Sequence, residues 1–175
     1  MYDQFYGFTG RPFQITPDPK FYFESGTHRK AMSYLGYGLA QGEGVIIITG
    51  ESGTGKTTLL GHLLQTVDAE RLNAVKLVAT QIAGDDLLAL TAEQFGLDFY
   101  GEEANQMLKG IEIYLRSQAR AGRRTLLLVD EAQNLSVAAL EQLTMLSNLY
   151  LGEHPLMQIF MLGQPEFRHT LSHSP

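Results

Sequence analysis

The sequence has no cysteine among its 175 residues. Disulfide bonds, zinc thiolate centres and a thiol nucleophile are therefore excluded. The five histidines are scattered and show no spacing typical of metal ligands. A chain without thiols fits a reducing compartment. Any chemistry that this protein performs must come from other side chains.

Long hydrophobic runs are also lacking. The opening MYDQFYGFTG has no basic region followed by an apolar core, so it is not a secretory signal. No apolar run approaches the roughly 18 residues that a membrane span needs, and we expect a soluble chain. The formal charge of −6 argues against a broad nucleic-acid footprint. The length suits one globular domain over residues 1–175 and is short for two ordinary ones.

One short stretch, GESGTGKTT, carries the strongest functional motif. Its spacing is that of GxxxxGK[ST], in which glycines let the backbone turn tightly and point several N–H groups at one phosphate. Lys56 is expected to reach the β- and γ-phosphates, and the Thr57 hydroxyl to hold magnesium. The β-branched run before the motif and the leucine-rich pattern after it supply the strand and helix that the motif requires. The predicted cofactor-binding residues in this loop are Gly50, Glu51, Ser52, Gly53, Thr54, Gly55, Lys56, Thr57 and Thr58.

Apolar periodicity divides the chain into alternating strands and helices, which predicts an α/β fold with a parallel sheet covered on both faces. The opening segment, residues 1–26, is rich in aromatic residues and proline and is expected to be extended and packed on the domain formed by residues 27–175. The predicted strands are Val45–Thr49, Asn73–Gln81, Thr125–Asp130 and Leu156–Gly163. The predicted helices are Thr27–Ala40, Thr57–Val67, Asp85–Phe95, Glu103–Ala121 and Val137–Leu149, followed by a last turn or helix that opens at Pro165.

A second motif lies in RTLLLVDEAQ, where apolar residues run into Asp130 and Glu131. The two carboxylates would stand at the carboxyl end of a buried strand, the edge at which ligands bind in open α/β sheets. Beside a phosphate loop, the first acid is expected to hold magnesium through water and the second to polarise the attacking water. Without the loop, the same pattern would equally fit a strand that ends in solvated acids.

Two polar residues at strand ends have weaker support. Gln164 follows the apolar run MQIFML and would face the γ-phosphate if this strand lies between the first and the third. A turn residue before Pro165 is the alternative interpretation. Thr80, at the end of the second strand, would be placed to hold Glu131 in an inactive orientation, although an ordinary strand threonine is the simpler interpretation.

The segments FYGFTGRPFQITPDPKFYF, HRKAMSYLGYGL, EGVIIITGESGTGKTTLL, LLLVDEAQNLS and MLGQPEF together resemble the AAA+ ATPases of the general-secretion-pathway A type, including relatives associated with exosortase and exopolysaccharide genes. The resemblance covers nearly the whole chain. It implies a three-layer P-loop NTPase fold of the AAA+/ASCE type with a mostly parallel sheet. The implied strand order is 5-1-4-3-2, with the fifth strand and the helical lid missing from this chain.

The resemblance also implies a site and an activity. Lys56 and Thr57 would contact phosphate and magnesium, and Asp130 and Glu131 would be the magnesium acid and the water acid. Gln164 would be a polar sensor, and His28 would lie near the adenine with the aromatic opening. The implied catalytic residues are thus Glu131, Lys56 and Gln164, and the implied activity is hydrolysis of ATP to ADP with Mg²⁺.

The resemblance further implies a cytoplasmic module that powers or regulates assembly of a secretion or exopolysaccharide-export apparatus. Its partners would be further copies of itself in a ring and envelope proteins of secretion or export, with no nucleic acid and with membrane attachment only through segments absent from this chain. Family members carry interface arginines beyond the segment that corresponds to MLGQPEF. Because this chain ends at HSP, we expect a truncated core that hydrolyses ATP slowly. Arg168 is expected to be a poor substitute for an interface arginine.

A second function class stays open, an ATP-gated DNA-binding oligomer of the transposition-regulator type. It would share the phosphate loop, the acidic strand end and the polar sensor. Its sequence support is a group of arginines near one side of a helix and its exit, which a solvated helix face explains as well. These arginines are Arg116, Arg120, Arg123 and Arg124. The acidic net charge favours the secretion function.

Overall fold

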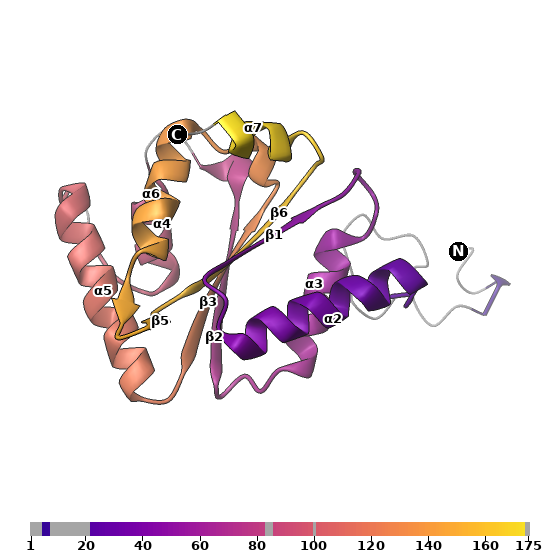
Figure 1. Ribbon diagram of the computed structural model, residues 1–175, viewed down its shortest axis with the longest axis horizontal. Helices are drawn as coiled ribbons and strands as arrows, with labels where there is room; N and C mark the ends of the chain where they lie inside the picture. The colour runs from indigo at the N-terminus through magenta and orange to yellow at the C-terminus, as the bar shows by residue number, and fades with distance from the viewer. Residues whose placement is uncertain (1–4, 8–21, 83–85, 100, 174–175) are drawn as a thin grey trace.

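A four-stranded parallel sheet forms the centre of the computed structural model (Figure 1). The structure describes residues 5–7, 22–82, 86–99 and 101–173. The strands lie in the order β1-β6-β3-β2, so chain neighbours are separated by crossovers. Their bounds are β1 Val45–Thr49, β2 Leu72–Val78, β3 Arg124–Asp130 and β6 Gln158–Gly163. The predicted parallel sheet and the order 1-4-3-2 of the predicted strands are confirmed.

The two inner strands are hydrophobic on both faces. Every residue of β6 is buried, and so is every residue of β3 except Arg124. The outer strands β1 and β2 instead alternate between more and less exposed positions. This difference is expected for a parallel sheet whose faces are both covered, because only the inner strands have neighbours on every side. A polar group at the carboxyl end of β3 or β6 is therefore placed by a rigid support.

Helices cover both faces of the sheet (Figure 1). On one face lie α2 (Gly26–Gln41) and α3 (Lys56–Thr66). On the other lie α4 (Leu87–Gln94), α5 (Ala104–Arg120) and α6 (Val137–Ser147). A last helix, α7 (Phe167–His173), follows β6. Among the described residues, no helix combines the length and the apolar character needed to cross a membrane.

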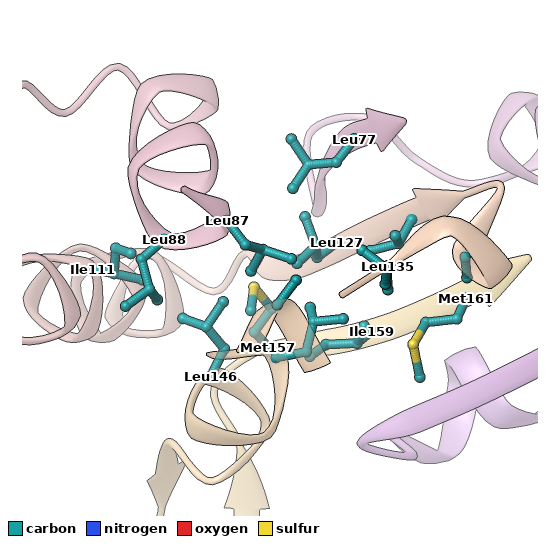
Figure 2. Close-up of a cluster of buried hydrophobic side chains, with 14 of the residues drawn as sticks. Leu77, Leu87, Leu88, Ile111, Leu127, Leu135, Leu146, Met157, Ile159 and Met161 are labelled. Carbon is teal, nitrogen blue, oxygen red and sulfur yellow. The ribbon is translucent and has the colours of Figure 1, made fainter. Parts of the chain in front are cut away.

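Two apolar cores hold these layers together. The larger core lies between the sheet and the helices α4, α5 and α6, where Leu127 and Ile159 of the inner strands meet Leu87, Ile111 and Leu146 (Figure 2). The smaller core lies under α2 and α3, on the opposite face of the same strands. Its buried residues are Leu35, Leu39, Leu59, Leu60, Leu63, Leu72, Leu126, Leu128, Phe160 and Leu162.

The second strand ends earlier than predicted. The ladder between β2 and β3 stops at the pair Val78 and Asp130, because the next residue of β3, Glu131, turns away with φ 56°. Without a ladder partner, residues Ala79–Gln81 form the 3₁₀ helix η2 instead of further strand. Thr80 therefore lies in η2 and is exposed.

A short hairpin before β6 was not predicted. Its strands are β4 (Tyr150–Leu151) and β5 (His154–Pro155), joined by a two-residue turn in which Gly152 has φ 64°. A glycine with positive φ at the first turn position is typical of hairpin turns, so the segment LGEH carried the signal. The predicted last strand, Leu156–Gly163, is accordingly shorter at its start, and the predicted helix Val137–Leu149 ends two residues earlier.

The opening segment lies largely outside the described residues. Within the described part, the ring of Tyr22 stacks on His62 of α3 with 4.3 Å between the ring centroids. The end of this segment therefore packs against the helix that follows the phosphate loop.

The fold generates a stability prediction. Leu127 has no exposed surface and lies in the larger core, so Leu127→Ala should lower the free energy of unfolding by about 2–5 kcal/mol. The matched control is Val137→Ala at the start of α6, where the side chain is 59% exposed and the change should stay within about 0.5 kcal/mol. Urea denaturation measures both, and equal losses would contradict the assignment of Leu127 to the core.

Candidate functional site

The loop between β1 and α3 has a backbone that glycines make accessible. Gly53 and Gly55 have φ values of 77° and 83°, in the left-handed region that residues with a Cβ avoid. Gly55 is also the N-cap of α3, so the loop leads directly into the amino end of this helix. Backbone N–H groups at a helix start carry partial positive charge and bind anions. The loop is therefore built as an anion cradle.

Lys56 places its charge inside this loop. Its ammonium group donates hydrogen bonds to the carbonyl oxygens of Gly50 at 2.7 Å and Glu51 at 2.8 Å. The loop is further fixed by Thr54, whose hydroxyl donates to the same carbonyl of Glu51 at 2.8 Å. A cation held beside the backbone N–H groups of a glycine-rich loop is an arrangement that can bind phosphates.

Asp130 connects the loop to the sheet. One carboxylate oxygen, Oδ2, accepts hydrogen bonds from the Thr57 hydroxyl at 2.9 Å and from the Lys76 ammonium at 2.7 Å. The other oxygen, Oδ1, accepts from the backbone N–H of Glu131 at 3.0 Å. Burial raises the pKa of this carboxyl, but the hydrogen bonds and the charge of Lys76 outweigh that effect, so the pKa lies below its ordinary value. Asp130 is thus a charged carboxylate on a buried strand.

Glu131 has a special backbone conformation. It is the one non-glycine residue with positive φ among the described residues, at 56°. Such a conformation is uncommon for a residue with a long side chain and occurs often at functional sites. It turns the chain out of β3 into the 3₁₀ helix η3 (Ala132–Asn134), and the side chain of Glu131 is exposed.

Gln133 bridges Glu131 and the end of β6. Its side-chain amide donates to the Glu131 carboxylate at 2.5 Å, and its amide oxygen accepts from the backbone N–H of Gln164 at 3.1 Å. The acid at the end of β3 and the polar residue at the end of β6 are therefore joined by one side chain. Gln133 is thus a direct partner of Glu131 in this structure, and the role suggested for Thr80 stays a prediction.

His28 contacts the phosphate loop. Its Nε2 lies 2.8 Å from the carbonyl oxygen of Thr54, and its Nδ1 lies 3.1 Å from that of Phe23. Both ring nitrogens thus face backbone carbonyl oxygens. His28 therefore joins the chain before α2 to the loop, while its expected position near the adenine stays a prediction.

The site residues come together at one edge of the sheet. The segment 50–58 follows β1, Asp130 ends β3 and Glu131 follows it, and Gln164 follows β6. Three neighbouring strands therefore position these residues. Arg168 is exposed on α7. Two residues with direct contacts were missed by the sequence reasoning, Lys76 and Gln133. Their signals were a lysine inside the apolar strand NAVKLV and a glutamine two residues after the acid pair.

The oxygen atoms at this edge suit a hard cation. Asp130 supplies a buried carboxylate and Thr57 a hydroxyl, which are the ligand types that Mg²⁺ prefers. The described residues contain no group of three or more His, Cys, Asp or Glu side chains that would hold a metal alone. This fits Mg²⁺, which is usually bound by one or two protein oxygens together with phosphates and water.

Comparison with known proteins agrees with this geometry. Residues 39–171 match the family model described as AAA domain. Over 172 residues, 98% of this chain, the sequence is 40% identical to General secretion pathway protein A of Aeromonas hydrophila. The chain spans 31% of the length of that relative.

Solved structures show the same fold at low sequence identity. The ORC2 protein of Aeropyrum pernix, in ADPNP–ADP complexes, has a TM-score of 0.62 at 16% identity, over 90% of this chain and 45% of its own. Cdc6p of Pyrobaculum aerophilum has a TM-score of 0.55 at 14% identity, over 90% of this chain and 42% of its own. Likenesses at this identity establish the fold alone.

The contacts of Asp130 generate a prediction about stability and pH. Asp130→Asn should lower the free energy of unfolding at pH 7 by about 1–2 kcal/mol, because Lys76 loses its charged partner while the side-chain shape is kept. A lowered pKa stabilises the folded state above the unfolded value of about 3.9, and this stabilisation is lost as the pH falls through the folded value. The difference from the unmodified protein should therefore shrink below about pH 4.

Urea denaturation between pH 7 and the acid limit of folding measures this difference. The control is Asp68→Asn, because the Asp68 side chain is 56% exposed and its pairing with Arg71 at 3.6 Å contributes little. A constant difference at all pH values would contradict the charged state assigned to Asp130.

Proposed function

We propose, from the premise that this chain belongs to the AAA domain family, that it binds ATP and ADP in the loop 50–58 and hydrolyses ATP. The observation that carries the proposal is the 2.9 Å hydrogen bond from Thr57 to Asp130, which joins the anion cradle to the acidic strand end. Phosphoryl transfer to water needs a phosphate cradle, a metal position and a group that polarises water. The residues to which we assign these three roles lie at the carboxyl edge of this sheet.

The phosphates would be bound by the loop and by Lys56. The glycine backbone supplies N–H donors, and the amino end of α3 adds its positive potential. Lys56 would exchange its two loop carbonyl partners for phosphate oxygens of higher negative charge. Nucleotide binding would therefore change the hydrogen bonds within the loop.

Magnesium fits the oxygen atoms of Thr57 and Asp130. A hydroxyl that donates its proton to Asp130 turns its own lone pairs outward, where a cation can use them. Bound magnesium would supply neutralisation of the charge that develops on the phosphate oxygens. Asp130 would hold the magnesium through its negative charge and through hydrogen bonds to bound water.

Glu131 is the group that we assign to the attacking water. Its carboxylate is exposed at the carboxyl edge of the sheet, so it can accept a proton from water. The hydrogen bond from Gln133 fixes the direction of this carboxylate. Gln164 is joined to the same side chain and would contact the γ-phosphate, which makes Gln133 a positioning residue between the two.

The wider role is proposed from the relative. The 40% identity with General secretion pathway protein A supports a function in secretion. Export of exopolysaccharide, a cytoplasmic location and a ring of identical subunits are further parts of the proposal, which the resemblance of the sequence motifs suggests. Slow turnover by this chain alone is part of the proposal, since an arginine supplied across a subunit interface is worth about 10³–10⁵ in rate.

The DNA-binding alternative has less support. Two of the arginines that favoured it make internal bonds. Arg116 pairs with Glu112 at 2.7 Å, and Arg124 donates to the carbonyl oxygen of Leu39 at 2.6 Å. Binding of duplex DNA that weakens steeply between low and moderate salt would favour this alternative.

Replacement of Lys56 tests the phosphate site. Lys56→Ala should weaken ADP binding by roughly 10- to 100-fold, because it removes a charged contact worth about 1.5–3 kcal/mol. The control is Lys109→Ala, since Lys109 is exposed on α5, away from the loop. Isothermal titration calorimetry gives both affinities. Equal affinities for the two variants would overturn the loop assignment.

Replacement of Glu131 separates binding from turnover. Glu131→Gln should bind ATP within about twofold of the unmodified protein and slow phosphate release by about 10²–10⁴, because the shape stays and the proton acceptor is lost. Glu141→Gln on the exposed side of α6 is the matched control and should leave both quantities unchanged. A Glu131 variant that releases phosphate at the unmodified rate would rule out the role assigned to Glu131.

A further inference from the structure

Lys76 is the one charged residue of β2, Leu72–Val78, all of whose positions the structure describes. Its neighbours in β2 pair with β3 in register, Lys76 with Leu128 and Val78 with Asp130. Paired residues of a ladder point to the same face of a sheet, and residues two apart in a strand do so too. Lys76 and Asp130 therefore share the face that α3 covers. The Lys76 side chain is 43% exposed, so its stem lies along the sheet while its ammonium reaches the carboxylate.

The ammonium of Lys76 and the hydroxyl of Thr57 bind the same atom. Both lie within hydrogen-bonding distance of Asp130 Oδ2, at 2.7 Å and 2.9 Å. A carboxylate oxygen has two lone pairs, so these two donors use both of them. The remaining oxygen already accepts the backbone N–H of Glu131. A magnesium ion held by Thr57 would thus meet a carboxylate whose charge is already neutralised by a neighbouring cation.

We propose that Lys76 is a competing internal cation that sets the magnesium affinity of this site. Its ammonium holds Asp130 in place when no metal is bound, and it repels a second cation at Thr57. Binding of magnesium must weaken the Lys76–Asp130 pair, so part of the metal's binding free energy is used for that purpose. The inference rests on the proposed nucleotide site and deepens it, because it names the residue that regulates its metal.

The proposal predicts the direction of a thermodynamic coupling. Magnesium strengthens ADP binding by some factor, and Lys76 reduces that factor because it opposes the metal. Lys76→Met removes the charge and keeps the apolar stem, so the factor should rise by about 3- to 10-fold, the change expected for one partly exposed charge pair. Lys76→Arg keeps a cation beside Asp130 and should stay within about twofold of the unmodified protein.

Calorimetric titration of the full chain with ADP, in magnesium chloride and in EDTA, gives the coupling factor for each variant. Lys109→Met on α5 is the control for loss of a surface lysine. An unchanged or smaller factor in Lys76→Met would overturn the proposal, since Lys76 would then be neutral toward the metal or would support its binding. Loss of ADP binding by Lys76→Met in EDTA would also overturn the proposal, because Lys76 would then be a phosphate contact.

A second readout does not depend on the nucleotide. Thermal melting in EDTA should show Lys76→Met below the unmodified protein, because Asp130 loses its cation. Addition of magnesium chloride alone should raise the melting temperature of this variant more than that of the unmodified protein. If ADP bound to none of the proteins, the proposed function would fail while this melting comparison still decided the role of Lys76. Lys76→Gln replaces the methionine variant if the latter does not fold.

Discussion

The carboxylate of Asp130 is the group on which the rest of the site depends. It ends a buried inner strand, so the sheet fixes its position, and it receives hydrogen bonds from α3, from β2 and from the next residue of its own chain. A buried charge is stable only when such partners surround it. The phosphate loop is thereby tied to the sheet through Thr57. The anion cradle and the acidic strand end form one rigid unit as a result.

The carboxyl ends of the two inner strands carry the parts that can respond to a ligand. Glu131 leaves β3 through a left-handed backbone conformation, and Gln133 links its carboxylate to the start of the chain after β6. A displacement of Gln164 would therefore move the Gln133 side chain and, through it, the Glu131 carboxylate. The adjacent Lys76–Asp130 pair is the contact to which we assign control of charge. In the proposed function, the water-activating acid and the metal position would thus be governed by different side chains, Gln133 and Lys76.

Two charged residues at the surface make hydrogen bonds within the molecule. Arg124 donates to backbone carbonyls at the end of α2, and Arg116 bonds Glu112 and the hairpin that precedes β6. The arginine group that suggested a nucleic-acid patch in the sequence therefore makes part of its hydrogen bonds within the molecule. His28 is similar, because its ring ties the chain before α2 to the phosphate loop.

The sequence by itself determined the α/β architecture and the positions of the glycine-rich loop and the acid pair, whereas the strand order was implied by the resemblance to a known family. Hydrophobic periodicity is local, and a glycine-rich loop between a strand and a helix has few alternative structures. The tertiary structure alone decided the partners of those residues. Lys76 lies 54 positions before Asp130, and Gln133 of η3 lies 31 positions before Gln164, so neither contact follows from spacing along the chain. The early end of β2 was decided in the same way, because ladder pairing stops where Glu131 turns out of the sheet.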